Sequence, residues 1–264
     1  MRLPFAAPLL AGLCLTLATA PAVAASSPYQ SVPVAVTVGA SAVALSKLAR
    51  DADPRVLQLA LEARDCAAAE LGQPASPRLA VIDYSRPSTA PRLWVFDLVA
   101  NKLLFREVVA HGQGTGENMA MHFSNSDGSH QSSLGLFRTA DTYEGHNGYS
   151  LRMQGLEPGT NDAAMARAIV MHGAAYVNPQ MAQSTGRLGR SWGCPALRPE
   201  VAHQVIDSLK GGQMLFAYYP DSGWLKRSPF LGCNARKASG LLLASNQGMP
   251  HSAPPASLAK AAPR

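Results

Sequence analysis

The sequence predicts a mainly β (α+β) fold with a few flanking helices. From Pro77 onward, short apolar, β-branched and aromatic runs alternate with turn residues, a pattern typical of strands. Two stretches carry apolar residues at helical spacing instead, one before Pro77 and one that begins at Pro199. Without an expected leader, about 240 of the 264 residues remain, which is enough for one large domain with a full hydrophobic core.

The first element with a clear pattern is a helix that begins near Asp53. Asp53 and Pro54 suit the N-cap and the first helical position, and apolar residues then recur at helical spacing until Gly72. The preceding residues 26–45 show no clear period, and we expect them to be extended or loosely helical. Residues 25–76 are therefore predicted to form an N-terminal extension whose amphipathic helix packs on the core.

The strands are predicted from short apolar runs bounded by turn residues. Candidate strands span residues 79–84, 93–98, 103–109, 136–139, 149–152, 168–171 and 214–219. The second and third flank a turn at residues 100–102 and form a hairpin. Residues 111–133 are polar and rich in Gly and Ser, and a segment of this length predicts a functional loop or lid.

Two further helices are expected between these strands. Asn161 and Asp162 suit the cap of a short helix over residues 163–167, and Pro199 opens a helix that Gly211 closes. The strand between them, over residues 168–171, would deliver His172 at its C-terminal end. The tail over residues 234–264 is rich in Ala, Ser and Pro and is predicted to be disordered.

The first 24 residues have the features of a signal peptide. One positive charge, Arg2, precedes an apolar run to Ala20, and Ala22-Val23-Ala24 forms a small-x-small cleavage signature. A membrane-spanning helix is the alternative, and Pro21 with the small residues after it suits cleavage better. Cys14 suggests lipidation, but Leu13 is a poor fit before a modified cysteine. We therefore expect an exported, periplasmic protein of the cell envelope, with no stable membrane insertion after cleavage.

The charge of the chain excludes some classes of partner. The formal net charge of +6 falls to +5 without the leader, because Arg2 is the only charged residue in it. This mild excess either serves solubility alone or favours an anionic partner such as a cell wall. Nucleic acid is not expected, because the basic residues are scattered and form no stripe with interleaved aromatic residues.

Export changes the interpretation of the cysteines, because thiols pair in an oxidising compartment. Without Cys14 three remain, so one is left over. Cys66 lies on the predicted helix and Cys233 follows the last core segment, and neither has a catalytic partner nearby in the sequence. We expect a Cys66–Cys233 disulfide and a free Cys194.

Cys194 is the strongest candidate for a catalytic residue. It follows His172 by 22 positions, and an imidazole can lower the pKa of a thiol or take its proton. Gly193 has no side chain, so backbone N–H groups can approach a reacting carbonyl there, while Pro195 has no N–H to add. The alternative is that Cys194 is a small buried apolar residue.

Other motifs are weaker. Gly112, Gly114 and Gly116 lack the spacing of a dinucleotide-binding loop and carry no Walker lysine. Four histidines at 111, 122, 130 and 146 lie outside any metal-binding motif. The sequence therefore predicts neither a metal nor an organic cofactor.

The segments around His172 and Cys194 resemble a known catalytic signature. Residues 169–173 read Ile-Val-Met-His-Gly and residues 186–197 read Gly-Arg-Leu-Gly-Arg-Ser-Trp-Gly-Cys-Pro-Ala-Leu. His-Gly, a spacer and Ser-x-Gly-Cys resemble the pattern of murein L,D-transpeptidases of the YkuD-like superfamily. Residues 132–137 and 143–151 also look similar to the branch described as murein L,D-transpeptidase catalytic domain proteins.

The resemblance implies a β-sandwich or barrel catalytic domain over residues 77–233. Its active site would act on peptidoglycan stem peptides. Cys194 would be the nucleophile and His172 the base, with Ser191 and Gly193 completing the site and its oxyanion hole. The chain would release D-Ala from a tetrapeptide stem through a thioester, form 3–3 cross-links and be acylated by carbapenems. Trp192 stands where a His commonly precedes the Gly-Cys pair, and Ala196 replaces a polar or basic residue.

Further residues near the motif are candidates for binding the stem. Arg187 and Arg190 can clamp its carboxylates, or else they are solvated loop charges. Tyr176 can line the cleft or donate to the oxyanion, and a packing role is the alternative. Gly173, next to the predicted base, is assigned to the substrate-binding side.

Two other functions stay open at this point. The same thioester hydrolysed by water would make the protein an L,D-carboxypeptidase. A secreted cell-wall-binding protein with an inert Cys194 is the non-catalytic alternative. The oligomeric state does not follow from the sequence.

Overall fold

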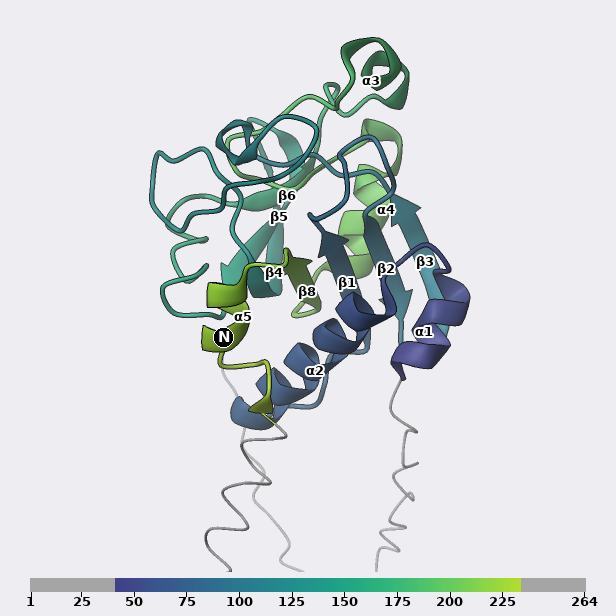
Figure 1. The fold of residues 1–264 in the computed structure, drawn as a ribbon, viewed down its shortest axis with the longest axis vertical. Helices are drawn as coiled ribbons and strands as arrows, with labels where there is room; N and C mark the ends of the chain where they lie inside the picture. Colours follow the sequence, from purple (N-terminus) through teal and green to yellow (C-terminus); the bar gives the residue numbers. More distant parts are fainter. Residues whose placement is uncertain (1–40, 234–264) are drawn as a thin grey trace, which may run out of the picture. The chain divides into compact units, whose positions relative to one another are not determined.

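A computed structural model of the protein describes residues 41–233 (Figure 1). The predicted signal peptide and the predicted C-terminal tail lie outside the described residues, as does most of the segment 26–45. The elements, in order, are α1 (Ala42–Leu48), α2 (Pro54–Glu70), β1 (Arg78–Asp83), β2 (Leu93–Asp97), β3 (Lys102–Glu107), η1 (Gln113–Thr115), β4 (Gly135–Gly145), β5 (Gly148–Gly155), β6 (Val170–Gly173), α3 (Pro179–Thr185), β7 (Ala196–Leu197), α4 (Pro199–Leu209), β8 (Met214–Tyr218) and α5 (Ser222–Arg227).

The eight strands form one sheet in the order β3-β2-β1-β8-β4-β5-β6-β7. The pairs β1–β8 and β6–β7 are parallel, and the other neighbours are antiparallel. A further antiparallel bridge joins Ala110, just beyond β3, to Ala196 in β7. Because this bridge links the two ends of the sheet, the sheet is nearly closed and resembles a barrel. The prediction of a mainly β fold with flanking helices is confirmed.

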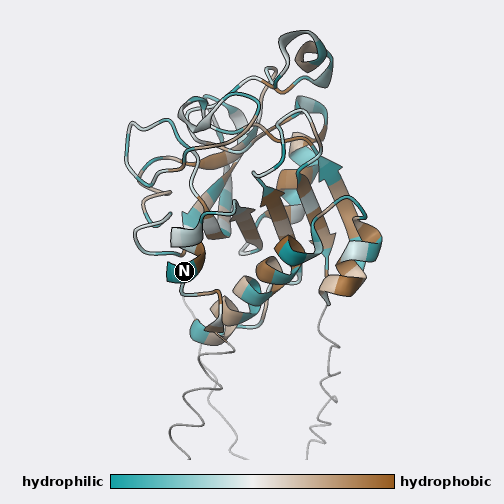
Figure 2. Ribbon diagram, viewed as in Figure 1, coloured by the Kyte–Doolittle hydropathy of each residue, from teal (hydrophilic) through white to brown (hydrophobic). Residues whose placement is uncertain are grey.

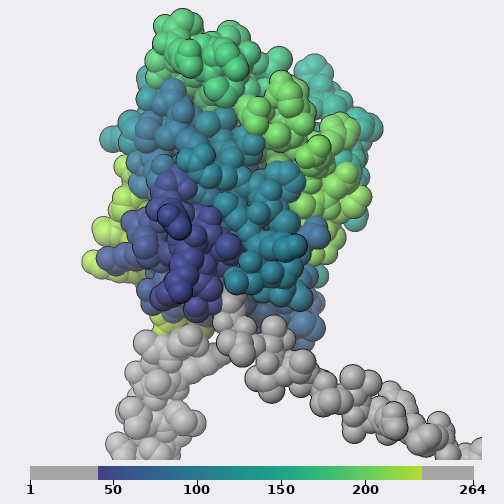
Figure 3. Space-filling view, turned by 90° about the vertical axis from the view of Figure 1, so that its right-hand side faces the viewer, coloured from purple at the N-terminus to yellow at the C-terminus, as the bar shows by residue number. Residues whose placement is uncertain are grey.

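The helices α1, α2 and α4 pack on the sheet. The Asp53 side chain caps α2 by accepting a hydrogen bond from the backbone N–H of Arg55 at 2.8 Å, with Pro54 at the start of the helix. Both apolar and polar residues occur along α2 (Figure 2), and apolar side chains such as Leu57 are buried where the helix packs on β1 and β8. The helix α4 packs on β6, β1 and β5, and α1 lies on the surface beside β3 (Figure 3).

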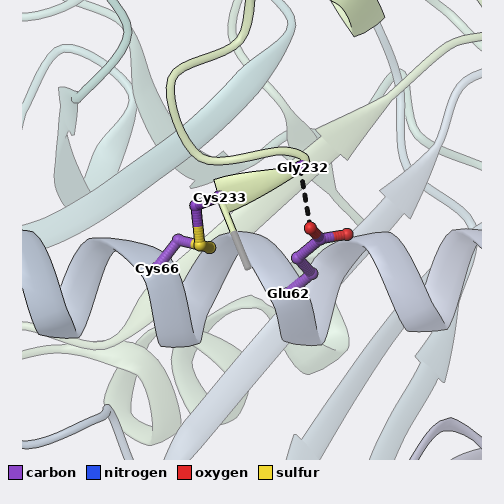
Figure 4. The surroundings of a disulfide bond; sticks show 4 residues. All are labelled: Glu62, Cys66, Gly232 and Cys233. Atoms are coloured by element: carbon purple, nitrogen blue, oxygen red, sulfur yellow. Dashed lines mark hydrogen bonds between the residues drawn. A yellow bond between two sulfur atoms is a disulfide. The ribbon is translucent and has the colours of Figure 1, made fainter. Parts of the chain in front are cut away.

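A disulfide joins Cys66 of α2 to Cys233, the pair expected from the sequence (Figure 4). Next to it, the Gly232 N–H donates to Glu62 Oε1 at 2.7 Å. The last described residues are thereby fastened to α2, and α1, α2 and the strands share one hydrophobic core. The predicted domain boundary at residue 77 stays a prediction.

One predicted helix is wrong. Residues 158–168 form successive turns and not a helix over 163–167. The Asn161 side chain does not cap a helix there, because it is buried and used elsewhere. Its Nδ2 donates to the carbonyls of Leu134 and Leu136 at 2.9 and 3.0 Å, and its Oδ1 accepts from the Glu157 N–H at 2.8 Å.

Five short elements were not predicted: α1, η1, α3, β7 and α5. Each has seven residues or fewer, so periodicity could not reveal them. None of the helices within residues 41–233 is long and apolar enough to cross a membrane.

Candidate active site

Two short strands bring Cys194 and His172 to one edge of the sheet. In the parallel pair of β6 and β7, His172 lies opposite Ala196 and Gly173 lies opposite Leu197. Cys194 precedes β7 by two residues, so this register places it beside the start of β6. There its Sγ accepts a hydrogen bond from the Val170 N–H at 3.4 Å.

Both side chains line an open pocket of about 420 Å³. Its lining residues are His146, Asn147, Arg167, Ala168, His172, Tyr176, Arg190, Ser191, Trp192 and Cys194. Five predicted site residues are thus brought together here, namely Cys194, His172, Ser191, Tyr176 and Arg190. Gly173, Gly193 and Arg187 lie beside these residues in the chain but do not line the pocket.

His172 is held in one orientation and is ready to accept a proton. Its Nδ1 lies 3.0 Å from the carbonyl oxygen of Gly173, which can only accept, so Nδ1 carries the hydrogen and Nε2 keeps its lone pair. Burial lowers the pKa of the imidazole, and the hydrogen bond to Gly173 opposes this effect. His172 is therefore a neutral imidazole near pH 7.

Cys194 is the one cysteine within residues 41–233 that is outside a disulfide, and it is buried. Burial raises the pKa of its thiol, while the Val170 N–H and the charge of Arg167 oppose the increase. The thiol donates to the Ala168 carbonyl at 3.7 Å and makes no hydrogen bond to His172 within the described residues. In this state the thiol is protonated near pH 7.

The turn that carries Cys194 is built by Ser191. Its Oγ donates to the Cys194 carbonyl at 2.6 Å and accepts from the Gly193 N–H at 3.1 Å. Gly193 has φ of +121°, and a Cβ there would lie 2.8 Å from the Gln131 carbonyl oxygen, so the position requires glycine. Because the Gly193 N–H is used inside the turn, an oxyanion hole here would depend on the Cys194 N–H.

The two predicted clamp arginines share one acidic partner. Arg187 and Arg190 each form an ion pair of 2.7 Å with Glu117, whose side chain is 70% exposed. Arg190 also donates to the Gly116 carbonyl at 3.0 Å. Both guanidinium groups that were expected to bind substrate carboxylates are therefore paired with Glu117. Of the two arginines, only Arg190 lines the pocket.

Arg167 and Trp192 are two of the five lining residues that the sequence did not assign to the site. Arg167 donates to the carbonyls of Ser124 and Gln131 at 2.8 and 2.7 Å and brings a positive charge to the pocket. The predicted helix over 163–167 gave no reason to place it there. Trp192 is 71% exposed and stacks on His130 with ring centroids 5.0 Å apart, so the rim carries a large aromatic face.

The histidines considered for metal binding are not clustered. Within residues 41–233, no three His, Cys, Asp or Glu side chains lie close enough together to hold a metal ion. His111 is buried, with its Nδ1 accepting from Arg92 at 2.8 Å and its Nε2 donating to the Gly116 carbonyl at 3.3 Å. Burial and the nearby Arg92 lower its pKa to about 4, so it is a neutral structural residue.

The sequence matches one family model, described as L,D-transpeptidase catalytic domain, over residues 48–218. None of the proteins with curated descriptions matches it.

Solved structures with detectable similarity include three bacterial proteins. An L,D-transpeptidase from Mycobacterium smegmatis is 14% identical with a TM-score of 0.35, and the match covers 56% of this chain and 61% of that one. The helical cell shape determining protein Pgp2 from Campylobacter jejuni is 10% identical with a TM-score of 0.41, covering 65% and 58%. An L,D-transpeptidase from Stackebrandtia nassauensis is 13% identical with a TM-score of 0.33, covering 67% and 76%. The chain thus spans about three fifths of the first two relatives.

Proposed function

The chain belongs to the L,D-transpeptidase catalytic domain family, and from this membership we propose that it is a murein L,D-transpeptidase that acts through a thioester on Cys194. The observation that carries the proposal is the pairing of a free thiol and an oriented, neutral imidazole on one open pocket. The other two cysteines of the described chain are joined to each other, so among the cysteines of residues 41–233 only Cys194 can act as a nucleophile.

In the first step, His172 Nε2 takes the thiol proton and Cys194 Sγ attacks the carbonyl carbon of the L-centre of diaminopimelate in a tetrapeptide stem. The new S–C bond replaces the peptide bond to the terminal D-Ala. His172 then gives the proton to the leaving amine of D-Ala. Because Nδ1 is held by Gly173, the imidazole keeps the orientation that both transfers need.

In the second step, the amine of a neighbouring stem attacks the thioester. A 3–3 peptide cross-link forms, the S–C bond breaks and the thiol is restored. Water in place of the amine would give a tripeptide, which is the L,D-carboxypeptidase outcome. No metal or organic cofactor takes part in either step.

The charge of the pocket suits a stem that carries free carboxylates. Arg167 and Arg190 line the pocket, and no acidic side chain of residues 41–233 does so. Arg190 can exchange Glu117 for a substrate carboxylate, because Glu117 is exposed and its ion pair is screened by solvent. The mild positive charge of the whole chain favours the same anionic polymer.

The family acts on peptidoglycan, which lies outside the cytoplasm. We infer that residues 1–24 direct export to the periplasm and are then removed. Residues 25–76 would be an extension to a catalytic domain over 77–233.

The test is intact-protein and product mass spectrometry with a purified tetrapeptide muropeptide. We expect the wild-type protein to release D-Ala and to form a cross-linked dimer, with Cys194→Ser inactive. His172→Gln should lose at least about 100-fold in rate. His203→Gln is the matched control, because His203 stacks on Tyr149 and does not line the pocket.

Three results would count against the proposal in different ways. Tripeptide without dimer would replace transpeptidation by hydrolysis. Turnover that survives in Cys194→Ser would exclude the thioester. No turnover and no covalent adduct in the wild-type protein would favour a wall-binding protein.

A further inference from the structure

The side chain of Ser132 lies directly behind the peptide that precedes the nucleophile. Ser132 is buried, and its Oγ donates to the Gly193 carbonyl at 2.9 Å while accepting from the Gly112 N–H at 3.0 Å. The Ser132 N–H in turn donates to Thr115 Oγ1 at 2.8 Å. The hydroxyl is thus fixed by contacts on both sides, and its single proton points at the Gly193 carbonyl.

This contact also fixes the direction of the Cys194 N–H. The Gly193–Cys194 peptide is planar and trans, so its C=O and N–H point in opposite directions. Ser132 and Gly193 line a small interior cavity of about 10 Å³, whereas Cys194 lines the open pocket. With the carbonyl directed inward to Ser132, the N–H is directed away from the interior.

The direction of that N–H matches the place where negative charge would develop. The Cys194 N–H interacts with its own Sγ and helps to lower the pKa of the thiol, against the larger effect of burial. The Cys194 side chain lines the open pocket, and this N–H is likewise directed away from the interior. A carbonyl attacked by Sγ would place its oxygen within reach of this donor.

Residues 193–195 offer no second backbone donor. The Gly193 N–H is bonded to Ser191 Oγ, and Pro195 has no N–H. Across residues 193–195 the Cys194 N–H is the only backbone donor left for an oxyanion.

Close packing keeps Ser132 in place. A Cβ on Gly112 would lie 2.8 Å from Gly193 Cα and 2.3 Å from the His130 carbonyl oxygen. The backbone at Gly112 therefore runs against the backbone at Gly193, and Ser132 joins the two.

We propose that Ser132 is a positioning residue for acyl transfer, which holds the Gly193 carbonyl so that the Cys194 N–H faces the developing oxyanion. This inference rests on the proposed function. Loss of the hydroxyl would let the Gly193–Cys194 peptide rotate, and the rate of carbonyl addition would fall while the thiol itself stayed in place.

The experiment compares two reactions of the same thiol in Ser132→Ala. In acylation by imipenem, Sγ bonds to the β-lactam carbonyl carbon, the ring C–N bond breaks and the nitrogen takes the thiol proton, so an oxyanion must be stabilised. In alkylation by iodoacetamide, Sγ displaces iodide and no oxyanion forms. Both rates are followed by intact-protein mass spectrometry. Circular dichroism first confirms that each variant is folded, because an unfolded chain would be alkylated but not acylated.

We expect the ratio of acylation to alkylation to fall about 10- to 100-fold in Ser132→Ala. Ser132→Thr keeps the hydroxyl and should restore most of the ratio. Ser76→Ala is the matched control, because Ser76 is also buried but donates to the Arg78 carbonyl at 2.5 Å, outside the pocket lining. Its ratio should equal that of the wild-type protein.

The outcomes separate the two ideas. If Ser132→Ala lowers both rates equally or neither rate, Ser132 has at most a structural role and the inference is overturned. If the wild-type protein is alkylated at Cys194 but never acylated, the proposed function fails, and the role of Ser132 fails with it.

Discussion

We expect removal of the Cys66–Cys233 disulfide to lower the free energy of unfolding by about 5 kcal/mol. The bond joins residues that are 167 positions apart in the sequence. In the chain-entropy description, closing a loop of this length removes about 17 cal/mol/K from the unfolded chain, which is about 5 kcal/mol at 25 °C. This is comparable with the whole stability of an ordinary domain, about 5 to 15 kcal/mol.

The assay is equilibrium unfolding in guanidinium chloride, followed by circular dichroism. The variant Cys66→Ser with Cys233→Ser is compared with Cys194→Ser, which changes one buried sulfur but leaves the chain connectivity intact. The double variant should unfold at a much lower denaturant concentration, and reduction of the wild-type protein should reproduce the shift. Cys194→Ser should lose no more than about 1 to 2 kcal/mol.

A loss below about 2 kcal/mol in the double variant would refute this reasoning. It would mean that the unfolded chain is already compact, or that the segment around Gly232 holds to α2 without the bond. The hydrogen bond from Gly232 to Glu62 is the contact that would then carry the attachment.

Three further predictions concern the pocket. Gly193→Ala should slow D-Ala release at least about 100-fold, because a Cβ at φ of +121° meets a backbone carbonyl oxygen at 2.8 Å. Gly186→Ala, at φ of +73° with nothing within 4 Å, is its control, and equal losses in the two variants would contradict the expectation. Glu117→Gln removes the ion pairs with Arg187 and Arg190 and frees both guanidinium groups. KM for a stem with free carboxylates should then fall about two- to fivefold at low salt, and an unchanged KM would argue against a carboxylate clamp. The acid limb of kcat/KM against pH should have its midpoint below about 6.5, because burial lowers the pKa of His172 and keeps the base neutral to lower pH; a midpoint above this value would exclude His172 as the buried base.

The lowered pKa of His172 also determines how stability changes with pH. Protonation of His172 is harder in the folded chain than in the unfolded chain, so the unfolded chain binds the proton more readily. Its contribution to stability is present above the ordinary pKa of histidine and is lost as the pH falls through the folded pKa. His172→Gln should therefore reduce the loss of stability on acidification, which thermal melts between pH 4 and 7 would detect.

Elements with a strong local pattern could be predicted from the sequence. The helix α2 follows from Asp53, Pro54 and the apolar spacing after them, and the strands on both sides of the turn at residues 100–102 follow from short apolar runs. Local chemistry is enough here, because caps, turns and periodicity involve residues close together in the chain.

The candidate nucleophile and base could also be named from the sequence, through the His-Gly and Ser-x-Gly-Cys segments and the resemblance that they carry. Their setting could not. The two-residue strand β7 is too short to leave a pattern in the sequence. Its pairing with β6 nevertheless places Cys194 in hydrogen-bond contact with Val170 and brings Cys194 and His172 to the same pocket.

The sequence by itself determined the fold class, α2 and most of the strands, because each depends on residue type and short spacing, and the family resemblance named the candidate reactive pair. Only the tertiary structure decided three contacts. Glu117 forms ion pairs with both arginines, the Asn161 side chain binds the carbonyls of Leu134 and Leu136 and does not cap a helix, and Ser132 donates to the Gly193 carbonyl. These contacts join residues 25 to 73 positions apart. The pairing of polar groups over such distances depends on how the whole sheet closes. A local sequence pattern cannot predict it.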